Sequence, residues 1–365
     1  MTGDAGTATD DAALFSGRAG ATLGLLGAGL ALALSVRPWP AETPRRVALL
    51  AAAVATLAFL LRRHGRIDRR RGAPIAGAGT AGIVVAGLAG IGAGADLPTG
   101  GLVCGAGVLA AAGAWSDWRA VPTDRFPPLV ARAAAAAAIG IAGIVAIVVW
   151  ASVLRALVPG EEISTLLETV LSTVALGLGT ATVAAGYLAV SDNDLGFVDV
   201  DRPDRREWGY VVGGTVLLLV SNLAISAAFG WLGVESTTHS IIRAARDTPE
   251  ILIALVPLSY LVVGPGEELL YRNIVQKSLT EEFSTVAAIV VATAIFAAVH
   301  LPAYADPSAS ALATLNTLAV VFVLSLILGT VYERTGNLVV SALVHGSFNA
   351  VAFLVAYAEL VGLLG

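Results

Sequence analysis

Long hydrophobic runs separated by short polar segments extend along almost the whole chain. A helix needs about 20 consecutive apolar residues to cross the ~30 Å hydrocarbon core of a bilayer. We expect a helix in each of the runs at residues 19–36, 47–61, 75–95, 102–114, 132–154, 163–190, 210–230, 251–282, 285–301, 311–331 and 338–363. Two of these runs, 47–61 and 102–114, are short for a full crossing. The pattern predicts an all-α, polytopic transmembrane helical bundle of about ten to eleven spans.

Composition supports a membrane location. Of the 365 residues, 56% are hydrophobic and only 13% are charged, whereas soluble domains carry about 25% charged residues. We therefore expect a multi-pass integral protein of the cell membrane, with the lipid bilayer as one partner. The net charge of −5 argues against nucleic acid as another partner. The single cysteine, Cys104, excludes a disulfide within the chain.

Arginine distribution predicts the orientation in the membrane. The loop at residues 62–71 contains six arginines, and an excess of arginine is typical of cytoplasmic loops. Counting spans from this loop places the N-terminus and the aspartate-rich loop 192–207 on the cytoplasmic side as well. The first 18 residues are polar and acidic and lack the basic segment of a secretory signal, so we expect the first run to be a retained helix.

Ionisable residues return to the interior of the apolar runs only after residue 264, beginning with Glu267-Glu268-Leu-Leu-Tyr271-Arg272. Helical residues four positions apart share a face, which places Glu267 beside Tyr271 and Glu268 beside Arg272. We therefore expect Arg272 to hold Glu268 and to leave Glu267 available for chemistry. The preceding Pro265-Gly266 pair is expected to break or kink the helix.

Two further polar pairs follow on the next helices. Phe296 and His300 are four residues apart near the end of one run, and His345 and Asn349 are four apart in the last run. A turn near residues 283–284 makes a hairpin with arms of equal length, so Glu267 and His300 would lie at the same depth, ~24 Å from the turn. The other two histidines, His64 and His239, are expected in solvated loops.

Each of these residues, taken singly, is more typical of packing or solvation than of catalysis. Tyr271 and Phe296 in particular are expected to serve as packing residues. Three polar clusters on neighbouring helices of an otherwise apolar chain nevertheless indicate function, because ionisable residues inside a membrane are costly to retain.

The three motifs, Glu267-Glu268-x-x-Tyr271-Arg272, Phe296-x-x-x-His300 and His345-x-x-x-Asn349, resemble those of the CAAX-protease and bacteriocin-processing family of Rce1-like intramembrane endopeptidases. The resemblance covers about residues 250–353, including the lead-in from Gly329 to Ser341. It divides the chain into an N-terminal membrane extension of unknown role at 1–200, a connecting span and loop at 205–250, and a catalytic core at 250–358.

The resemblance implies an endopeptidase of the CAAX prenyl protease 2 type acting on a membrane-associated peptide or protein. Glu267 would be the general base that activates water, assisted by His300. His345 and Asn349 would polarise the scissile carbonyl or stabilise the oxyanion. Glu268 and Arg272 would be structural or orienting, with Tyr271 and Phe296 in support.

Cofactor use and two other functions remain open at this point. Glu267, His300 and His345 are residues that can bind a divalent metal such as zinc, although their spacing is not the His-Glu-x-x-His of classical zinc peptidases. A proton-coupled transporter would also use intramembrane carboxylates and histidines, but the polar residues lie at one end of the chain. A catalytically silent scaffold or immunity factor is disfavoured because every expected catalytic position is filled.

Overall fold

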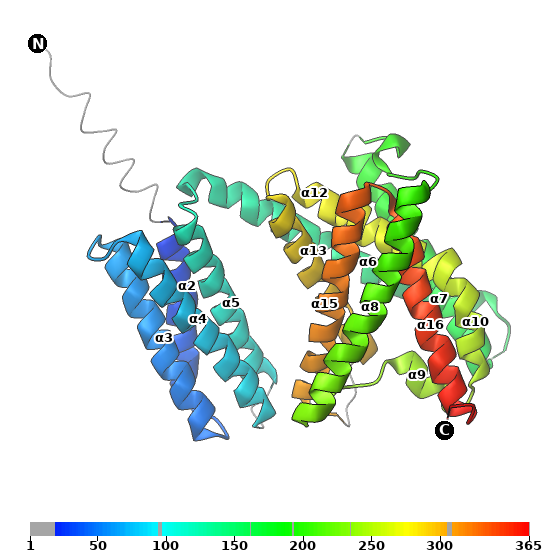
Figure 1. Cartoon of the computed structure of the whole chain (residues 1–365), viewed down its shortest axis with the longest axis horizontal. Coiled ribbons are helices and arrows are strands. Elements are labelled where there is room, and N and C mark those ends of the chain that lie inside the picture. The colour runs from blue at the N-terminus through cyan, green and yellow to red at the C-terminus, as the bar shows by residue number, and fades with distance from the viewer. Residues whose placement is uncertain are drawn as a thin grey trace, which may run out of the picture. The chain divides into compact units, whose positions relative to one another are not determined.

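The computed structural model describes residues 19–93, 97–160, 162–191, 193–233, 235–304 and 309–364. Within these ranges the regular elements are helices and no strand is present (Figure 1). Among the same residues, nine helices are long and apolar enough to cross a membrane, and two shorter apolar helices span Gly20–Ser35 and Thr285–Val299. The predicted all-α membrane fold of about ten to eleven spans is confirmed. The N-terminal 18 residues and the end of the run 75–95 lie outside the described residues.

The chain divides into two compact units, one reaching Val130 and the other starting at Ala131, with Ser310–Leu312 grouped with the first. The boundary falls inside the expected extension, so residues 131–200 are part of the C-terminal unit. The division into an extension at 1–200, a connecting part at 205–250 and a catalytic core at 250–358 stays a prediction.

The N-terminal unit is a four-helix arrangement of α2 (Ala19–Ser35), α3 (Glu42–Arg63), α4 (Arg69–Gly92) and α5 (Leu97–Trp118). Helix α2 packs against α3 and α5, and α4 packs against the same two neighbours. The runs that looked too short for a crossing belong to α3 and α5, which have 22 residues each. At 1.5 Å per residue each helix is about 33 Å long, because polar residues at both ends continue the helix.

Glycine allows the backbones of α2 and α5 to touch. A Cβ atom on Gly113 would lie 2.2 Å from the backbone nitrogen of Gly24, and one on Gly27 would lie 2.5 Å from that of Ala110. Small residues are favoured at membrane helix contacts because association there depends on close packing and not on the exclusion of water. The alanine- and glycine-rich composition of this unit is therefore what its packing requires.

One buried ion pair ties α3 to α5. Arg62 donates from Nε and Nη2 to the two carboxylate oxygens of Asp117, at 2.8 and 2.7 Å, and from Nη1 to the Ile67 carbonyl. The Asp117 side chain is only 1% exposed. The bidentate geometry compensates a carboxylate that the surrounding helices remove from water.

Replacing Arg62 should destabilise this unit. Arg62→Met leaves the Asp117 carboxylate buried without its partner, and breaking a buried pair in this way costs about 3 kcal/mol. Thermal unfolding of the purified protein in detergent should show the loss. The exposed neighbour supplies the matched control, Arg63→Met, which should melt as the wild type does. Equal melting of the two variants would contradict the prediction.

The C-terminal unit contains the remaining helices and places the polar motifs. Its elements are α6 (Phe126–Leu157), α7 (Thr165–Val190), α8 (Arg205–Leu232), α9 (Ser240–Ala244), a continuous helical segment Glu250–Leu279, α13 (Thr285–Val299), α14 (Leu301–Tyr304), α15 (Ala311–Thr335) and α16 (Leu338–Leu360). The turn between the Glu250–Leu279 segment and α13 occupies residues 280–284, where the sequence predicted it.

The segment Glu250–Leu279 contains two π-helical stretches. It comprises α10 (Glu250–Leu258), the π-helical η3 (Ser259–Val263), α11 (Gly264–Glu268), the π-helical η4 (Leu269–Gln276) and α12 (Lys277–Leu279). The expected break at Pro265-Gly266 does not occur, because the backbone stays helical through both residues. Proline lacks the N–H of a regular turn, and the wider π turns on either side accommodate it.

Glycines at this point let the segment approach its neighbours. A Cβ atom on Gly264 would lie 2.6 Å from the carbonyl oxygen of Ala342 in α16, and one on Gly266 would lie 2.8 Å from the hydroxyl of Thr180 in α7. The two carboxylates that follow are therefore held between α7 and α16.

Hydrogen bonds and an ion pair hold the aspartate-rich loop against the helices of this unit. Lys277, the only lysine in the chain, donates to both carboxylate oxygens of Asp199 at 2.8 and 2.9 Å. The Tyr332 hydroxyl donates to the same carboxylate, and Asn273 accepts from the Asp199 backbone N–H. Asn337 bonds the backbone on the far side of the loop at Asp201. The loop thereby connects the Glu250–Leu279 segment to the junction of α15 and α16.

Candidate active site

The adjacent carboxylates end α11 and have different surroundings. Glu268 is completely buried and Glu267 is 9% exposed. Both face neighbouring helices, and Glu267 also borders a cavity of about 980 Å³. The two acids can therefore play different parts, as the sequence predicted.

Each oxygen of the Glu268 carboxylate has a hydrogen-bond partner. Arg272 Nε donates to its Oε2 at 3.1 Å, which confirms the predicted pairing, and His345 Nδ1 lies 2.9 Å from its Oε1. Arg272 is itself fully buried and donates from Nη2 to the Ser325 hydroxyl at 3.0 Å. The carboxylate, the guanidinium and the imidazole form one network that joins η4, α15 and α16.

This network fixes the His345 ring. A carboxylate accepts but does not donate, so the nitrogen facing Glu268 carries a hydrogen and the other nitrogen points away from it. That Nε2 atom lies 3.7 Å from Glu267 Oε2. Helical spacing could not predict that Glu268 orients His345, because the two residues are 77 positions apart in the chain.

His300 approaches Glu267 from another helix. It follows the last turn of α13, and its Nδ1 lies 2.7 Å from the Phe296 carbonyl oxygen. A carbonyl only accepts, so Nδ1 carries the hydrogen and Nε2 is left toward Glu267, whose Oε2 is 4.0 Å away. The hairpin argument thus placed Glu267 and His300 correctly at one depth.

Glu267 Oε2 is therefore a buried oxygen facing two imidazole nitrogens. Within the described part of the chain, no hydrogen bond reaches this atom. Separations of 3.7 and 4.0 Å exceed a direct hydrogen bond and suit a bridging water molecule. A carboxylate that shares a water with imidazoles is a suitable general base.

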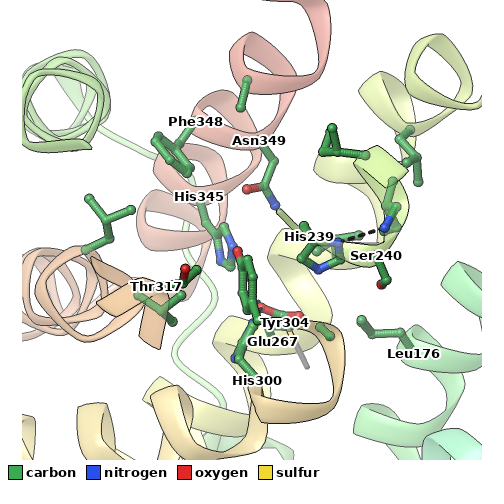
Figure 2. Close-up of a pocket in the computed structure, with 18 of the residues that line it drawn as sticks. Leu176, His239, Ser240, Glu267, His300, Tyr304, Thr317, His345, Phe348 and Asn349 are labelled. Carbon is green, nitrogen blue, oxygen red and sulfur yellow. Dashed lines mark hydrogen bonds and ion pairs between the residues drawn. The ribbon is translucent and has the colours of Figure 1, made fainter. Parts of the chain in front are cut away.

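Asn349 completes the predicted set. It lies one turn beyond His345 on α16 and lines the same cavity (Figure 2). No hydrogen bond within the described residues occupies its amide, so the amide is available to a ligand.

Tyr271 and Phe296 serve as packing residues. Both are buried, and their rings meet edge to face with centroids 5.0 Å apart. Phe296 also lies 4.4 Å from the His300 ring and beneath the Arg272 guanidinium, at 5.1 Å. Packing against these aromatic rings helps to hold the His300 ring and the Arg272 guanidinium in place.

The side chains as they stand do not form a metal site. Among the described residues, no group of three histidine, cysteine, aspartate or glutamate side chains is arranged to hold a metal ion. His300 and His345 each bond through Nδ1 to an acceptor, which is how metal-binding histidines are commonly oriented. The atoms that would hold a divalent metal such as zinc, if one were bound, are Glu267 Oε2 and the Nε2 atoms of His300 and His345.

Three residues that line the cavity were not predicted as part of the site. His239, Ser240 and Tyr304 lie in its wall with Glu267, His300 and His345 (Figure 2). His239 does lie in the loop before α9, but it is only partly exposed, because it borders the cavity and packs against the Tyr304 ring. No periodicity marks a loop residue of this kind, so the sequence carried no signal for it.

Removal of Arg272 should be more damaging than removal of the whole ion pair. Arg272→Met leaves Glu268 with a buried, partly compensated charge and should lower stability by about 3 kcal/mol. The double variant Glu268→Gln/Arg272→Met carries no buried charge at these positions and should recover part of that loss. Thermal unfolding of the two variants in detergent measures the difference. A double variant less stable than Arg272→Met would contradict a network built on this ion pair.

Comparison with known families agrees with this geometry. Residues 249–351 match the family model described as type II CAAX prenyl endopeptidase Rce1-like. No curated protein and no solved structure matches the chain. The matched range contains all eight residues of the predicted site and the helices that bring them together. Residues 249–351 of this polytopic membrane protein are therefore similar to the Rce1-like family, by the match to its family model.

Proposed function

We propose that the protein is an intramembrane endopeptidase that hydrolyses a peptide bond with a water molecule activated by Glu267 and His300. The observation that carries the proposal is the position of Glu267 Oε2, buried, without a hydrogen bond, and facing the Nε2 atoms of His300 and His345 at 4.0 and 3.7 Å. The substrate is a membrane-associated peptide or protein.

The reaction begins with a water molecule between Glu267 and His300. The water donates one hydrogen to the Glu267 carboxylate and the other to His300 Nε2, whose lone pair faces it. Glu267 takes a proton as the water oxygen attacks the carbonyl carbon. The resulting tetrahedral intermediate carries its negative charge on the former carbonyl oxygen.

The Asn349 amide stabilises that oxyanion by donating a hydrogen bond, which is worth most in a site that excludes bulk water. His345 donates through Nε2 in its protonated form, with Glu268 holding the opposite side of the ring. When the C–N bond breaks, the proton held by Glu267 passes to the leaving amine, and the carboxylate is restored. No serine or cysteine nucleophile takes part.

The test uses protein purified in detergent and a quenched, farnesylated CAAX-type peptide. Glu267→Gln is the matched control, since it is isosteric but cannot accept the proton. We expect cleavage by the wild type and a loss of at least 100-fold in the variant, as typical for removal of a general base. Equal cleavage by both would overturn the assignment of Glu267.

If neither protein cleaves the farnesylated peptide, the membrane proteomes of cells expressing each should be compared. Products present only with the wild type would keep the peptidase and replace the prenylated substrate. Identical proteomes would instead favour a catalytically silent scaffold.

Metal dependence is a separate prediction. Because water activation is assigned to Glu267 and His300, we expect the purified, active protein to contain well under one zinc ion per chain and to retain activity after exposure to a chelator. Elemental analysis of the wild type and of His300→Ala decides the point. One zinc per wild-type chain, lost in His300→Ala, would contradict the proposed mechanism.

A further inference from the structure

His239 lies in the cavity wall, on a segment that is hydrogen-bonded to α15. The chain between α8 and α9 is bonded to α15 at two points: the Thr237 N–H donates to Thr317 Oγ1 at 2.8 Å, and Asn316 Nδ2 donates to the Glu235 carbonyl at 2.9 Å. The segment therefore holds His239 at a defined place in the wall that also contains Glu267 and His300.

The ring of His239 is fixed in orientation. Its Nδ1 accepts a hydrogen bond from the Ile241 backbone N–H at 3.1 Å, so the ring caps the short helix α9. The planes of the His239 and Tyr304 rings are perpendicular, with centroids 4.9 Å apart. Figure 2 shows His239, Tyr304 and His300 around the same cavity.

The bond to Ile241 determines which nitrogen carries the hydrogen. A neutral imidazole has one donor and one acceptor nitrogen, and because Nδ1 accepts, Nε2 carries the hydrogen. Burial, followed by the charges of His300 and Arg243, lowers the pKa of His239 to about 4. The ring therefore stays neutral near pH 7. Within the described residues, no hydrogen bond uses its Nε2–H.

We propose that His239 is a substrate-binding residue, whose Nε2–H donates a hydrogen bond to a main-chain carbonyl of the bound peptide. This inference rests on the proposed function. An extended peptide inside a membrane protein must have its carbonyl groups paired, because an unpaired one costs several kcal/mol away from water. A fixed neutral donor in the wall of the catalytic cavity meets that need.

The ring contacts also give the approximate position of the carbonyl. Tyr304 contacts both His239 and His300, with ring centroids 4.9 Å from the first and 6.5 Å from the second. An extended chain advances ~3.3–3.6 Å per residue. The carbonyl bound by His239 therefore lies within about three residues of the bond that is cleaved.

Two substitutions distinguish the hydrogen bond donated by His239 Nε2–H from the two structural contacts of the ring, the cap of α9 and the packing on Tyr304. His239→Phe keeps an aromatic ring against Tyr304 and loses both nitrogens. His239→Asn keeps a side-chain acceptor suited to the helix cap and loses the ring. Both lose the Nε2–H. His64→Phe, in the arginine-rich loop of the other unit, is the control for loss of a histidine elsewhere.

The experiment compares new N-termini in membranes of cells that express the wild type, Glu267→Gln and these three variants at equal levels. The purified variants are then assayed on a peptide spanning a site that the wild type cleaves. We expect both His239 variants to lower kcat/KM by about 5- to 10-fold, the effect of one hydrogen bond. The change should fall mainly on KM, and His64→Phe should equal the wild type.

Other results would overturn the inference. Wild-type kinetics in both His239 variants would exclude the contact. A loss in His239→Asn alone would make the residue a packing partner of Tyr304, and a loss in His239→Phe alone would make it only a helix cap. New N-termini that are identical with and without Glu267 would overturn the peptidase itself, and with it the substrate contact. The two failures are thus distinguishable.

Discussion

The arrangement of the candidate site depends on one buried carboxylate. Glu268 is completely removed from solvent, and a charge in that position is stable only if its oxygens are compensated. Arg272 supplies the opposite charge from the same helical segment, and His345 supplies a hydrogen bond from α16. Because Arg272 also bonds Ser325 on α15, compensation of a single acid aligns three separate parts of the unit.

Within the described part of the molecule, Glu267 Oε2 has no hydrogen-bond partner because the nearby donors bond other groups. If Arg272 or His345 Nδ1 bonded Glu267 instead of Glu268, Glu267 Oε2 would no longer be without a partner. Arg272 and His345 Nδ1 are instead committed to Glu268, and His300 Nδ1 is committed to a backbone carbonyl. The groups left toward Glu267 are two imidazole nitrogens at non-bonding distance, which leaves space for a reactant between them.

The sequence predicted the parts of this site that depend on regular geometry. Four-residue spacing predicted Glu268 beside Arg272, and the equal arms of a hairpin predicted Glu267 beside His300. The contact of His345 with Glu268 could not be predicted, because it depends on the tilt of α16 against the Glu250–Leu279 segment. The place of His239 depends on the path of an irregular loop, for which hydrophobic periodicity gives no information.

The π-helical stretches on either side of α11 add a constraint on chain length. Each residue of a regular helix turns the chain by about 100°, so a one-residue deletion in η4 that its wider π turns do not absorb would rotate Arg272 away from α15 or Glu268 away from α16. The same deletion in η3 would turn both acids away from the cavity, even though every side chain of the motif remained. Natural variants of this segment should therefore tolerate exchange of apolar residues far more readily than insertion or deletion.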